Sequence, residues 1–160
     1  MEDLSIRHVL PSDYLPVISV LNEWWGGRNM SDMLPRLFFV HFQDTGFVVE
    51  HEERIVGFLV GFFSQTFADQ AYIHFAGIHP GFRRKGLGRI LYESFFDAAK
   101  ENGRRVVKSV TSPANKASIA FHLAMGFQVD KADTVVDGIS VSGAYDGPGG
   151  DRVLFSRKLE

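Results

Sequence analysis

Ile73–Asn102 has the sequence I-H-F-A-G-I-H-P-G-F-R-R-K-G-L-G-R-I-L-Y-E-S-F-F-D-A-A-K-E-N, and this stretch decides the fold. Its apolar beginning, Ile73–Ile78, predicts a strand, and His79–Phe82 predicts a turn. Apolar residues then recur at helical spacing, which predicts a long helix over Gly86–Glu101. The chain is therefore expected to run here from a buried strand through a glycine-containing loop into a helix.

The loop before this helix carries three consecutive cations, Arg83, Arg84 and Lys85, followed by Gly86 and Gly88. Glycine lets the backbone approach a ligand closely, and the first N–H groups of a helix have no partner inside it. These N–H groups and the helix dipole favour an anion, and the cations add positive charge. The pattern predicts a pyrophosphate site; a solvated basic turn is the ordinary alternative.

The composition is that of an ordinary globular domain. The 160 residues are 45% hydrophobic and 22% charged, with a formal net charge of −2, so we expect one domain over residues 1–160. This balance provides no general attraction to nucleic acid or to an anionic membrane. The longest apolar stretch, Ile55–Phe63, is too short to span a bilayer.

The chain contains no cysteine, which excludes disulfides and a cysteine nucleophile. Its beginning, M-E-D-L-S-I-R, lacks the basic and apolar regions of a signal peptide, so a cytoplasmic location is expected. The six histidines lack H-x-x-x-H or H-E-x-x-H spacing, so no metal site is expected.

The remaining pattern predicts a mixed fold. Strands are expected at Ser5–Val9, Gly46–His51, Arg54–Phe63, Ala71–Ile78, Val106–Thr111, Phe127–Asp130 and Val153–Lys158. Helices are expected from Pro11 to Trp24, from about Asp32 to Phe42, over Gly86–Glu101 and over Asn115–Met125. Gly143–Gly150 is rich in glycine and is expected to be a mobile loop. The irregular alternation, with hairpins at both ends, predicts an α/β (α+β layered) fold with a mixed sheet.

Two motifs in this order resemble the GNAT superfamily of acyl-CoA-dependent N-acyltransferases. R-R-K-G-L-G, at Arg83–Gly88, is similar to that family's R/Q-x-x-G-x-G/A signature, and the preceding G-I-H-P is similar to the end of its fourth strand. Ala117–Phe127, A-S-I-A-F-H-L-A-M-G-F, is similar to its second motif, N-x-x-A/S followed by a helix that ends in G-F. The resemblance runs from about Ile6 to the C-terminal strand. It implies a GNAT-like mixed six- or seven-stranded sheet flanked by about four helices.

The resemblance also implies that acetyl-CoA (coenzyme A) binds where two strands part. The backbone of Ala76, Gly77 and Ile78 would pair with the pantetheine arm, and an amide there would stabilise an oxyanion. Asn115 and Ser118 are expected either to contact the cofactor or to form a helix N-cap. The pyrophosphate is expected on the loop residues Arg83, Arg84, Lys85, Gly86, Leu87, Gly88 and Arg89.

His122 stands where the family often has a tyrosine, and this is a departure from its pattern. Asn115, Ser118 and His122 share one helix face by their spacing. An imidazole with an ordinary pKa near ~6.5 would donate a proton to the leaving thiolate, and a place late in the helix favours the cation. A histidine that packs or hydrogen-bonds at the helix surface is the alternative.

Tyr72 and His74 are further candidates for catalysis. Counting along the strand by twos places them on one face with Ala76 and Ile78. His74 is expected to take the proton of the amine, with a hydrogen-bonded core histidine as the alternative. Some family members have a glutamate at the position of Tyr72, so its absence leaves a carboxylate base unassigned.

The acceptor side has its own candidates. Trp24, Trp25 and Arg28 lie where the family's first helices border the acceptor pocket, and Tyr145 lies in the glycine-rich loop that would close over it. Core tryptophans and a plain hairpin loop are the alternatives.

Together these expectations describe direct transfer of an acetyl group from acetyl-CoA to a primary amine of a small molecule or a protein. A non-catalytic CoA-binding sensor or regulatory module is the alternative, because the family's tyrosine and glutamate are absent. A nucleotide-binding loop is disfavoured, since neither G-x-x-x-x-G-K-[ST] nor G-x-G-x-x-G occurs. Homodimers are common in the family, so a homodimer is one expected assembly.

Overall fold

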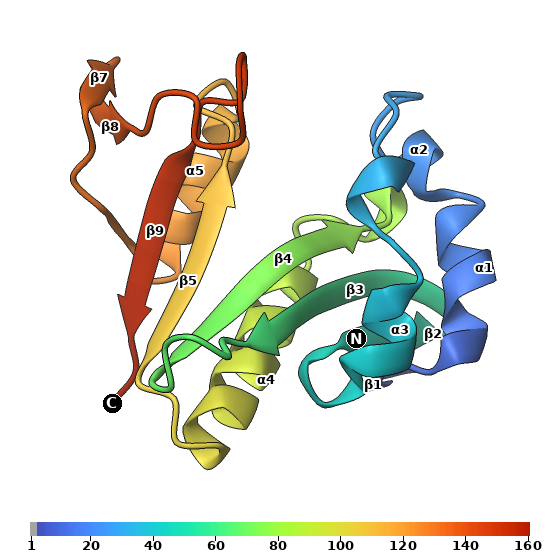
Figure 1. Cartoon of the computed structure of the whole chain (residues 1–160). Coiled ribbons are helices and arrows are strands. Elements are labelled where there is room, and N and C mark those ends of the chain that lie inside the picture. The colour runs from blue at the N-terminus through green and yellow to red at the C-terminus, as the bar shows by residue number, and fades with distance from the viewer. Residues whose placement is uncertain (1–2) are drawn as a thin grey trace.

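A seven-stranded mixed sheet organises the chain, with strand order β1-β2-β3-β4-β5-β9-β6 (Figure 1). The computed structural model describes residues 3–160. The sheet strands are β1 (Leu4–His8), β2 (Phe47–His51), β3 (Arg54–Phe63), β4 (Gln70–Ile78), β5 (Val106–Thr111), β6 (Gln128–Val129) and β9 (Val153–Lys158). The pair β4–β5 is parallel and the other neighbours are antiparallel, as in a mixed sheet. The expected mixed sheet of six or seven strands is confirmed, with seven strands.

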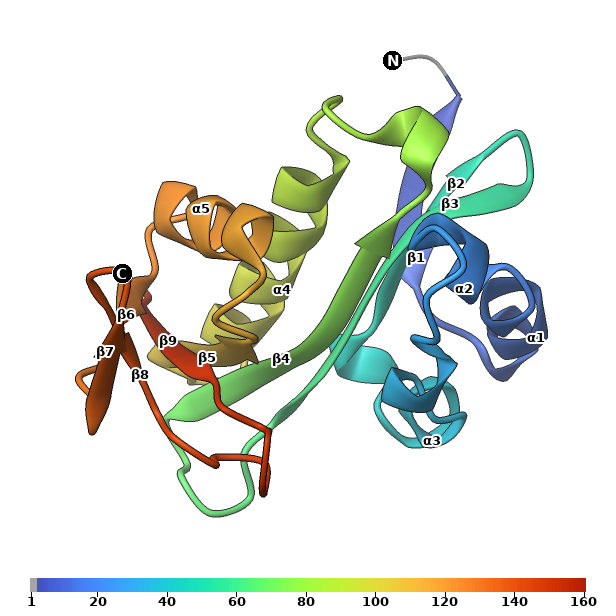
Figure 2. The ribbon, with the colours of Figure 1, turned by 90° about the horizontal axis from the view of Figure 1, so that it is seen from above.

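Helices cover both faces of this sheet. They are α1 (Tyr14–Ile18), α2 (Leu21–Trp24), α3 (Leu37–His41), α4 (Leu87–Glu101) and α5 (Lys116–Ala124) in the described part of the chain. Figure 2 shows α4 and α5 on one face and α1, α2 and α3 on the other. Each face has its own apolar core, because each layer of helices buries a stripe against the strands.

Helix α4 is the central element of the first core. Leu87, Leu91 and Phe95 are buried at helical spacing, as the sequence predicts, and Ala98 is half-buried beside them. The helix packs on β2, β3 and β4 and so fixes where the loop before it stands relative to the sheet.

The two N-terminal helices predicted from the sequence are interrupted. In place of one helix from Pro11 to Trp24, a 3₁₀ turn at Pro11–Asp13 precedes α1 and α2. In place of a helix from Asp32, a 3₁₀ turn at Ser31–Met33 is followed by extended backbone at Leu34 and then by α3. Pro35 explains the second break, since it lacks an N–H and disfavours helical backbone in the residue before it.

A second, two-stranded sheet was not predicted. It is the hairpin β7 (Thr134–Val136) and β8 (Ile139–Val141), which projects beside β9. The Gly143–Gly150 loop that follows is closed by hydrogen bonds from the Asp146 N–H to the Gly150 carbonyl (2.9 Å) and from the Gly150 N–H to the Gly147 carbonyl (2.8 Å). The structure therefore shows this loop as a turn closed by its own backbone hydrogen bonds.

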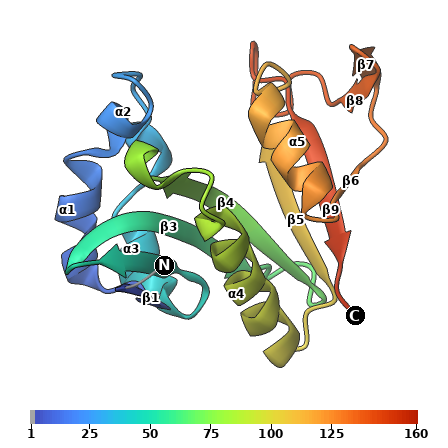
Figure 3. The same cartoon turned by 180° about the vertical axis from the view of Figure 1, so that it is seen from behind.

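The parallel strands β4 and β5 separate along their length. They pair at Gln70–Val106, Ala71–Val107 and Tyr72–Lys108, and β4 then continues to Ile78 beside β3 alone. Figures 1 and 3 show the two strands diverging towards their carboxyl ends. The part of β4 after Tyr72 therefore has a backbone edge with no strand partner.

A β-bulge in β4 overturns one prediction from the strand pattern. Val60 pairs with Phe75 and Gly61 pairs with Ile73, so His74 is the extra residue. A bulge shifts the alternation of faces by one residue. Tyr72 and His74 consequently do not share a face with Ala76 and Ile78, as counting by twos had predicted. His74 and Phe75 both face α1–α3, whereas Ala76 and Ile78 pack in the core under α4.

Gly61 at this bulge has no room for a side chain. A Cβ there would press on the Tyr72 carbonyl and lie 2.8 Å from a ring carbon of Phe95. We predict that Gly61→Ala lowers the free energy of unfolding by roughly 1–3 kcal/mol, because backbone must move to relieve the overlap.

Urea denaturation measures this effect, with Gly143→Ala as the control. A Cβ at Gly143 would meet its nearest atom, a carboxylate oxygen of Asp133, at 3.4 Å, and we expect a change within about 0.5 kcal/mol. Equal effects of the two substitutions would contradict the assigned packing.

Candidate active site

The loop before α4 presents unpaired amides at its surface. Gly86 precedes the helix in a left-handed conformation (φ 80°), and the first hydrogen bond of the helix runs from the Ile90 N–H to the Gly86 carbonyl (3.1 Å). The amides of Leu87, Gly88 and Arg89 therefore have no partner inside the 15-residue helix. This end of the helix is suited to an anion.

The cations around this loop have different surroundings. Arg84, Lys85 and Arg89 are exposed, and Arg84 has a positive φ of 62°. Arg83 instead donates hydrogen bonds to the carbonyls of Trp24 (2.6 Å) and Ile78 (3.2 Å). Arg83 thus joins the end of α2 to the end of β4, and of the three consecutive cations Arg84 and Lys85 are better placed for a phosphate.

Gly88 allows α4 and α5 to approach closely. A Cβ at this position would lie 3.3 Å from two ring carbons of Phe121 on α5. The glycine of the loop motif therefore serves helix packing as well as access to the helix amides.

The free edge of β4 lies next to these amides. The His79 N–H donates to the Val56 carbonyl beside β3 (2.8 Å), and strand amides alternate in direction. Gly77 accordingly directs its backbone groups to β3, whereas Ala76 and Ile78 direct theirs to the side where β5 has separated. Of the three residues predicted for the cofactor, two have backbone groups on the open side.

Gly77 has a different reason to be glycine. A Cβ there would lie 2.6 Å from the ring of Trp25 and 2.7 Å from that of Phe58. Trp25 is half-buried over the strand at this point, and its ring packs on Phe75 at 5.2 Å between centroids. The lack of a side chain at Gly77 thus lets Trp25, at the end of α2, pack on β4 beside its open edge.

Trp24 and Arg28 do not line the open edge of β4 in the way that Trp25 does. Trp24 is buried against Phe58 and at the edge of His79, as in the core alternative. Arg28 is exposed in the turn after α2.

Asn115 forms the N-cap of α5. Its side-chain oxygen accepts a hydrogen bond from the Ser118 N–H at 3.0 Å, which satisfies one of the helix's free donors. The capping alternative is thus present in the structure, and the exposed Asn115 borders the diverging strands from the β5 side.

His122 is buried between α4, α5 and the sheet. It is 4% exposed, and its ring stacks on Phe155 at 4.5 Å. Nδ1 lies 2.8 Å from the Ser118 carbonyl and must donate to it, so Nε2 accepts from the hydroxyl of Tyr92 at 3.1 Å. Both nitrogens of a neutral imidazole are therefore used within the protein.

This environment corrects the expected charge of His122. Burial lowers the pKa of His122 below its usual range, and the hydrogen bond to the Ser118 carbonyl opposes this only partly. The expected stabilisation of the cation late in the helix is therefore not the net effect, because burial of the ring favours its neutral form.

His74 is half-buried on the opposite face of the sheet. Its Nε2 donates to the Met33 carbonyl at 2.7 Å, and its ring stacks on Phe38 at 4.6 Å with an interplanar angle of 7°. Burial lowers the pKa of His74, with the hydrogen bond to Met33 opposing. Nδ1 has no hydrogen-bond partner within the described residues and is not fully buried. A neutral imidazole with one unbonded nitrogen is able to accept a proton.

Tyr72 lies two residues before His74 and stacks on Phe62 at 5.2 Å. Burial, together with smaller contributions from the nearby Tyr145 and Asp146, raises the pKa of Tyr72 to about 12. The phenol is therefore neutral at physiological pH. This influence also places the glycine-rich loop near Tyr72, across the space from α2.

Several contributors were not predicted from the sequence. Tyr92 is buried one position after Leu91. The helical spacing of Tyr92, Phe96 and Ala99 is the sequence signal that could have identified this second buried face of α4. Arg152, which pairs with Asp146 at 2.9 Å and anchors the loop, has no local sequence signal.

A separate cavity of about 540 Å³ lies between α1, α2 and the turn from β2 to β3. Among its lining, Arg7 pairs with Asp13 (2.9 Å) and Glu50 (2.6 Å). Across residues 3–160, no helix is long and apolar enough to cross a membrane, and no three potential metal ligands gather.

Comparison with known proteins identifies a family. The family model described as Acetyltransferase (GNAT) family matches residues 14–127, well over half of the chain.

The similar curated proteins match over shorter stretches. L-2,4-diaminobutyric acid acetyltransferase of Nocardia farcinica is 30% identical over 84 residues, which cover 52% of this chain and 44% of that protein. L-amino acid N-acyltransferase MnaT of Escherichia coli is 36% identical over 56 residues, 35% of this chain and 33% of that protein. The chain thus spans less than half the length of both relatives.

Solved structures match over nearly the whole chain. Ard1 from Thermoplasma volcanium has a TM-score of 0.78 at 20% identity and covers 99% of both chains. Diaminobutyrate acetyltransferase EctA from Paenibacillus lautus, in complex with L-2,4-diaminobutyric acid and coenzyme A, has a TM-score of 0.72 at 22% identity, covering 96% of this chain and 93% of that one. At these identities the likeness establishes the fold.

The buried pair Tyr92–His122 leads to a stability prediction. Either His122→Phe or Tyr92→Phe leaves a buried polar group without its partner, at a cost of roughly 1–3 kcal/mol in the free energy of unfolding. The double substitution removes both groups and should cost less than the sum of the singles. Urea denaturation at pH 7.5 measures the cycle; strictly additive losses would argue against the hydrogen bond.

The same residue predicts a pH dependence. Because the pKa of His122 is lowered in the folded state, the unfolded chain takes up a proton first as pH falls below about 6.5, and stability drops by up to about 1.4 kcal/mol per pH unit. His122→Phe should reduce this slope, whereas substitution of His41, which is exposed, is the control. A slope that is identical in wild type and His122→Phe would refute the assignment.

Proposed function

This chain belongs to the acetyltransferase (GNAT) family, and we propose that it transfers an acetyl group from acetyl-CoA directly to an amino group. The observation that carries the proposal is the meeting of two features. The unpaired backbone edge of β4 lies beside the free amides that begin α4. An extended ligand with a pyrophosphate at one end fits this combination.

The residues present fit acetyl-CoA, which supplies the activated acyl group when bound. The amides of Leu87, Gly88 and Arg89 would hold the pyrophosphate, with Arg84 and Lys85 adding charge. The backbone of Ala76 and Ile78 would bond to the pantetheine arm along the free edge of β4.

The same edge supports stabilisation of the transition state. An N–H of β4 on the open side, from Ala76 or Ile78, would donate to the carbonyl oxygen as negative charge develops on it. Because β3 pairs with β4 up to Ile78, this donor is held before the reaction begins.

We assign acceptance of the amine proton to His74. Its Nε2–H is held by the Met33 carbonyl, so Nδ1 has the lone pair, and its lowered pKa keeps the ring neutral near pH 7. The nitrogen of the acceptor forms a bond to the acyl carbon, the carbon–sulfur bond breaks, and the proton passes to Nδ1 or through water. Tyr72, neutral beside it, would orient the acceptor by its hydroxyl.

His122 is given a positioning role. Since both of its nitrogens are bonded to Ser118 and Tyr92, it would hold α5 against α4. The leaving thiolate has a pKa near ~8.5 by analogy with cysteine and would regain a proton from water.

The acceptor is proposed to be a primary amine of an amino-acid-like small molecule, with a protein amino group as the second class. The support is that the names of two similar proteins specify L-2,4-diaminobutyric acid and L-amino acids. Trp25 and the loop around Tyr145 flank the space in front of His74 and Tyr72, where the amine would bind.

The alternative is a CoA-binding regulatory module without turnover. The observation that favours it is the engagement of both nitrogens of His122 at the position of the family's usual proton donor.

Two measurements separate the transferase from the regulatory module. Calorimetric titration with acetyl-CoA, with ATP and NAD as controls, measures binding. Free-thiol release over a panel of amines measures turnover. Selective binding with amine-dependent thiol release supports the transferase. Binding without release from any amine favours the regulatory module, and no binding overturns both.

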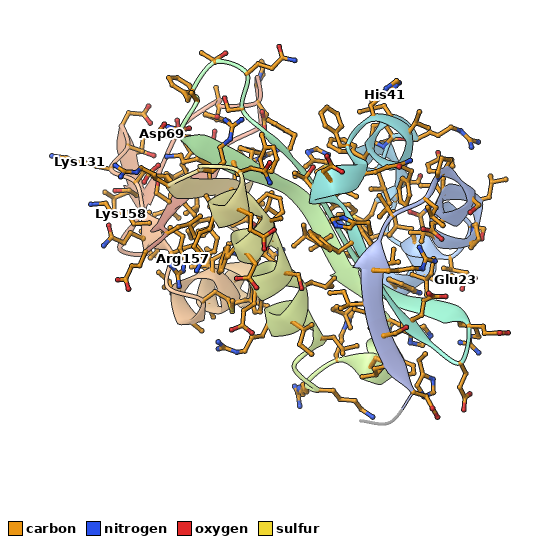
Figure 4. The ribbon with its side chains drawn as sticks, turned by 90° about the horizontal axis from the view of Figure 1, so that it is seen from below. Glu23, His41, Asp69, Lys131, Arg157 and Lys158 are labelled. Atoms are coloured by element: carbon orange, nitrogen blue, oxygen red, sulfur yellow. The ribbon has the colours of Figure 1, made fainter. Side chains whose placement is uncertain are left out.

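The assignment of the phosphate loop predicts a change in affinity. Arg84→Ala should raise the Kd for acetyl-CoA roughly 10- to 100-fold, because a charge-assisted contact worth roughly 1.5–3 kcal/mol is lost. The matched control is Lys131→Ala, an exposed cation far from the loop (Figure 4). An unchanged Kd in Arg84→Ala, measured by calorimetry, would place the phosphates elsewhere.

The assignment of His74 predicts a change in kcat. His74→Asn retains a donor for the Met33 carbonyl but has no basic nitrogen, so kcat should fall on the order of 10²-fold while the Kd for acetyl-CoA stays the same.

The pH profile provides the second readout. In the wild type, activity should rise with pH through a pKa below the usual histidine value, as the base loses its proton. This limb should be missing in His74→Asn. A profile unchanged by the substitution would remove His74 from the reaction.

A further inference from the structure

The sheet face in front of the proposed reaction centre is lined by aromatic rings. We call it the aromatic face, and it consists of half-buried side chains on α2, β3, β4 and the end of α3: Trp25, Phe42, Phe62, Tyr72, His74 and Phe75. The rings form two groups of contacts. Trp25 and Phe75 have centroids 5.2 Å apart, whereas Phe62 lies 5.8 Å from Phe42 and 5.2 Å from Tyr72.

The bulge in β4 brings rings of both groups to one side of the sheet. In a regular strand, His74 and Phe75 would face opposite sides of the sheet. Because His74 is the extra residue at the bulge, both rings lie on the side of α1–α3. Phe38, which is buried, connects His74 to the group of Phe42, Phe62 and Tyr72 by stacking on His74 (4.6 Å) and by contact with Phe42 (5.4 Å).

The polar groups of the aromatic face are neutral. Tyr72 keeps its proton, since its pKa is raised to about 12. Burial lowers the pKa of His74, and no carboxylate acts to raise it. The acidic group that acts on Tyr72 is Asp146, and Arg152 neutralises it in an ion pair of 2.9 Å. Among the described residues, Asp146 is thus the one carboxylate that acts on Tyr72 or His74, and it is already paired.

The border beside His74 is also apolar. Met33, whose carbonyl holds the His74 ring, is 42% exposed, and Leu37 at the start of α3 is 45% exposed. These side chains offer further apolar surface next to the rings, as a binding site for an apolar group would.

We propose that the acceptor is an amine with an uncharged, apolar side chain, which packs on the aromatic face, and that this face rejects a side chain ending in ammonium. The inference rests on the proposed acetyl transfer and narrows its substrate class. A charged side chain would lose water without gaining a counter-ion, whereas an aliphatic or thioether chain would bury apolar surface on the rings.

The decisive comparison uses two amino acids of equal shape. L-Norvaline and L-2,4-diaminobutyric acid differ by a terminal methyl in place of the ammonium. With acetyl-CoA at saturation, kcat/KM for norvaline should exceed that for diaminobutyric acid on the order of tenfold or more. Calorimetric binding of both amines to the protein saturated with CoA should show the same order.

Variants assign the preference to the aromatic face. Phe62→Ala should lower kcat/KM for norvaline several-fold, and Phe62→Glu should move the preference towards diaminobutyric acid by supplying a carboxylate. Phe67→Ala removes an exposed ring from the loop between β3 and β4 and is the matched control, with no change expected. Circular dichroism and unchanged affinity for acetyl-CoA verify that each variant is folded.

The outcomes separate this inference from the proposed function. Turnover with diaminobutyric acid equal to or above norvaline overturns the inference and leaves the transferase in place. Acetyl-CoA binding without thiol release from any amine overturns the transferase, and amine binding then decides the inference alone. Equal binding of the two amines, or binding of neither, overturns it.

Discussion

The site depends on the early end of pairing between β4 and β5. Backbone N–H and C=O groups need hydrogen-bond partners when water is excluded. A strand that is paired on both edges has no free backbone groups left to bind a ligand. After Tyr72, β4 is bonded to β3 on one side only, so its other edge is available while its geometry stays fixed. This combination lets an extended ligand be held by the main chain, without dependence on the identity of the side chains at Ala76 and Ile78.

Two side-chain contacts hold the surroundings of that edge. Arg83 bonds to the carbonyls of Trp24 and Ile78, which fixes the loop before α4 and the end of α2 against the strand. The buried Tyr92–His122 hydrogen bond joins α4 to α5. Each contact involves a residue with a different predicted role. The first motif predicted that Arg83 binds the pyrophosphate, and the second predicted that His122 donates a proton. A motif therefore marks the neighbourhood of a site more securely than it marks the role of each member.

The β-bulge at His74 determines which side chains of β4 lie on the face towards α1–α3, where we propose that the acceptor binds. By adding one residue, it places His74 and Phe75 together and leaves Ala76 in the opposite core. The Met33 carbonyl then fixes the tautomer of His74, and the stacked rings make its surroundings apolar. The proposed base and the proposed acceptor surface are thus coupled through one irregularity of the backbone.

The sequence alone determined the main elements and the loop, since hydrophobic periodicity and glycine placement are local properties. The strand, the glycine loop and α4 of the Ile73–Asn102 stretch, the hairpin of β2 and β3, and the cap at Asn115 all follow from neighbouring residues. Tertiary structure decided the features that depend on contacts between distant elements. The bulge required the pairing of β3 with β4, the burial of His122 required α4 and β9, and the neutral state of Tyr72 required burial in the sheet with a loop more than seventy residues away. Periodicity carries no information about these long-range contacts, because they depend on where separate segments meet once their apolar faces are buried.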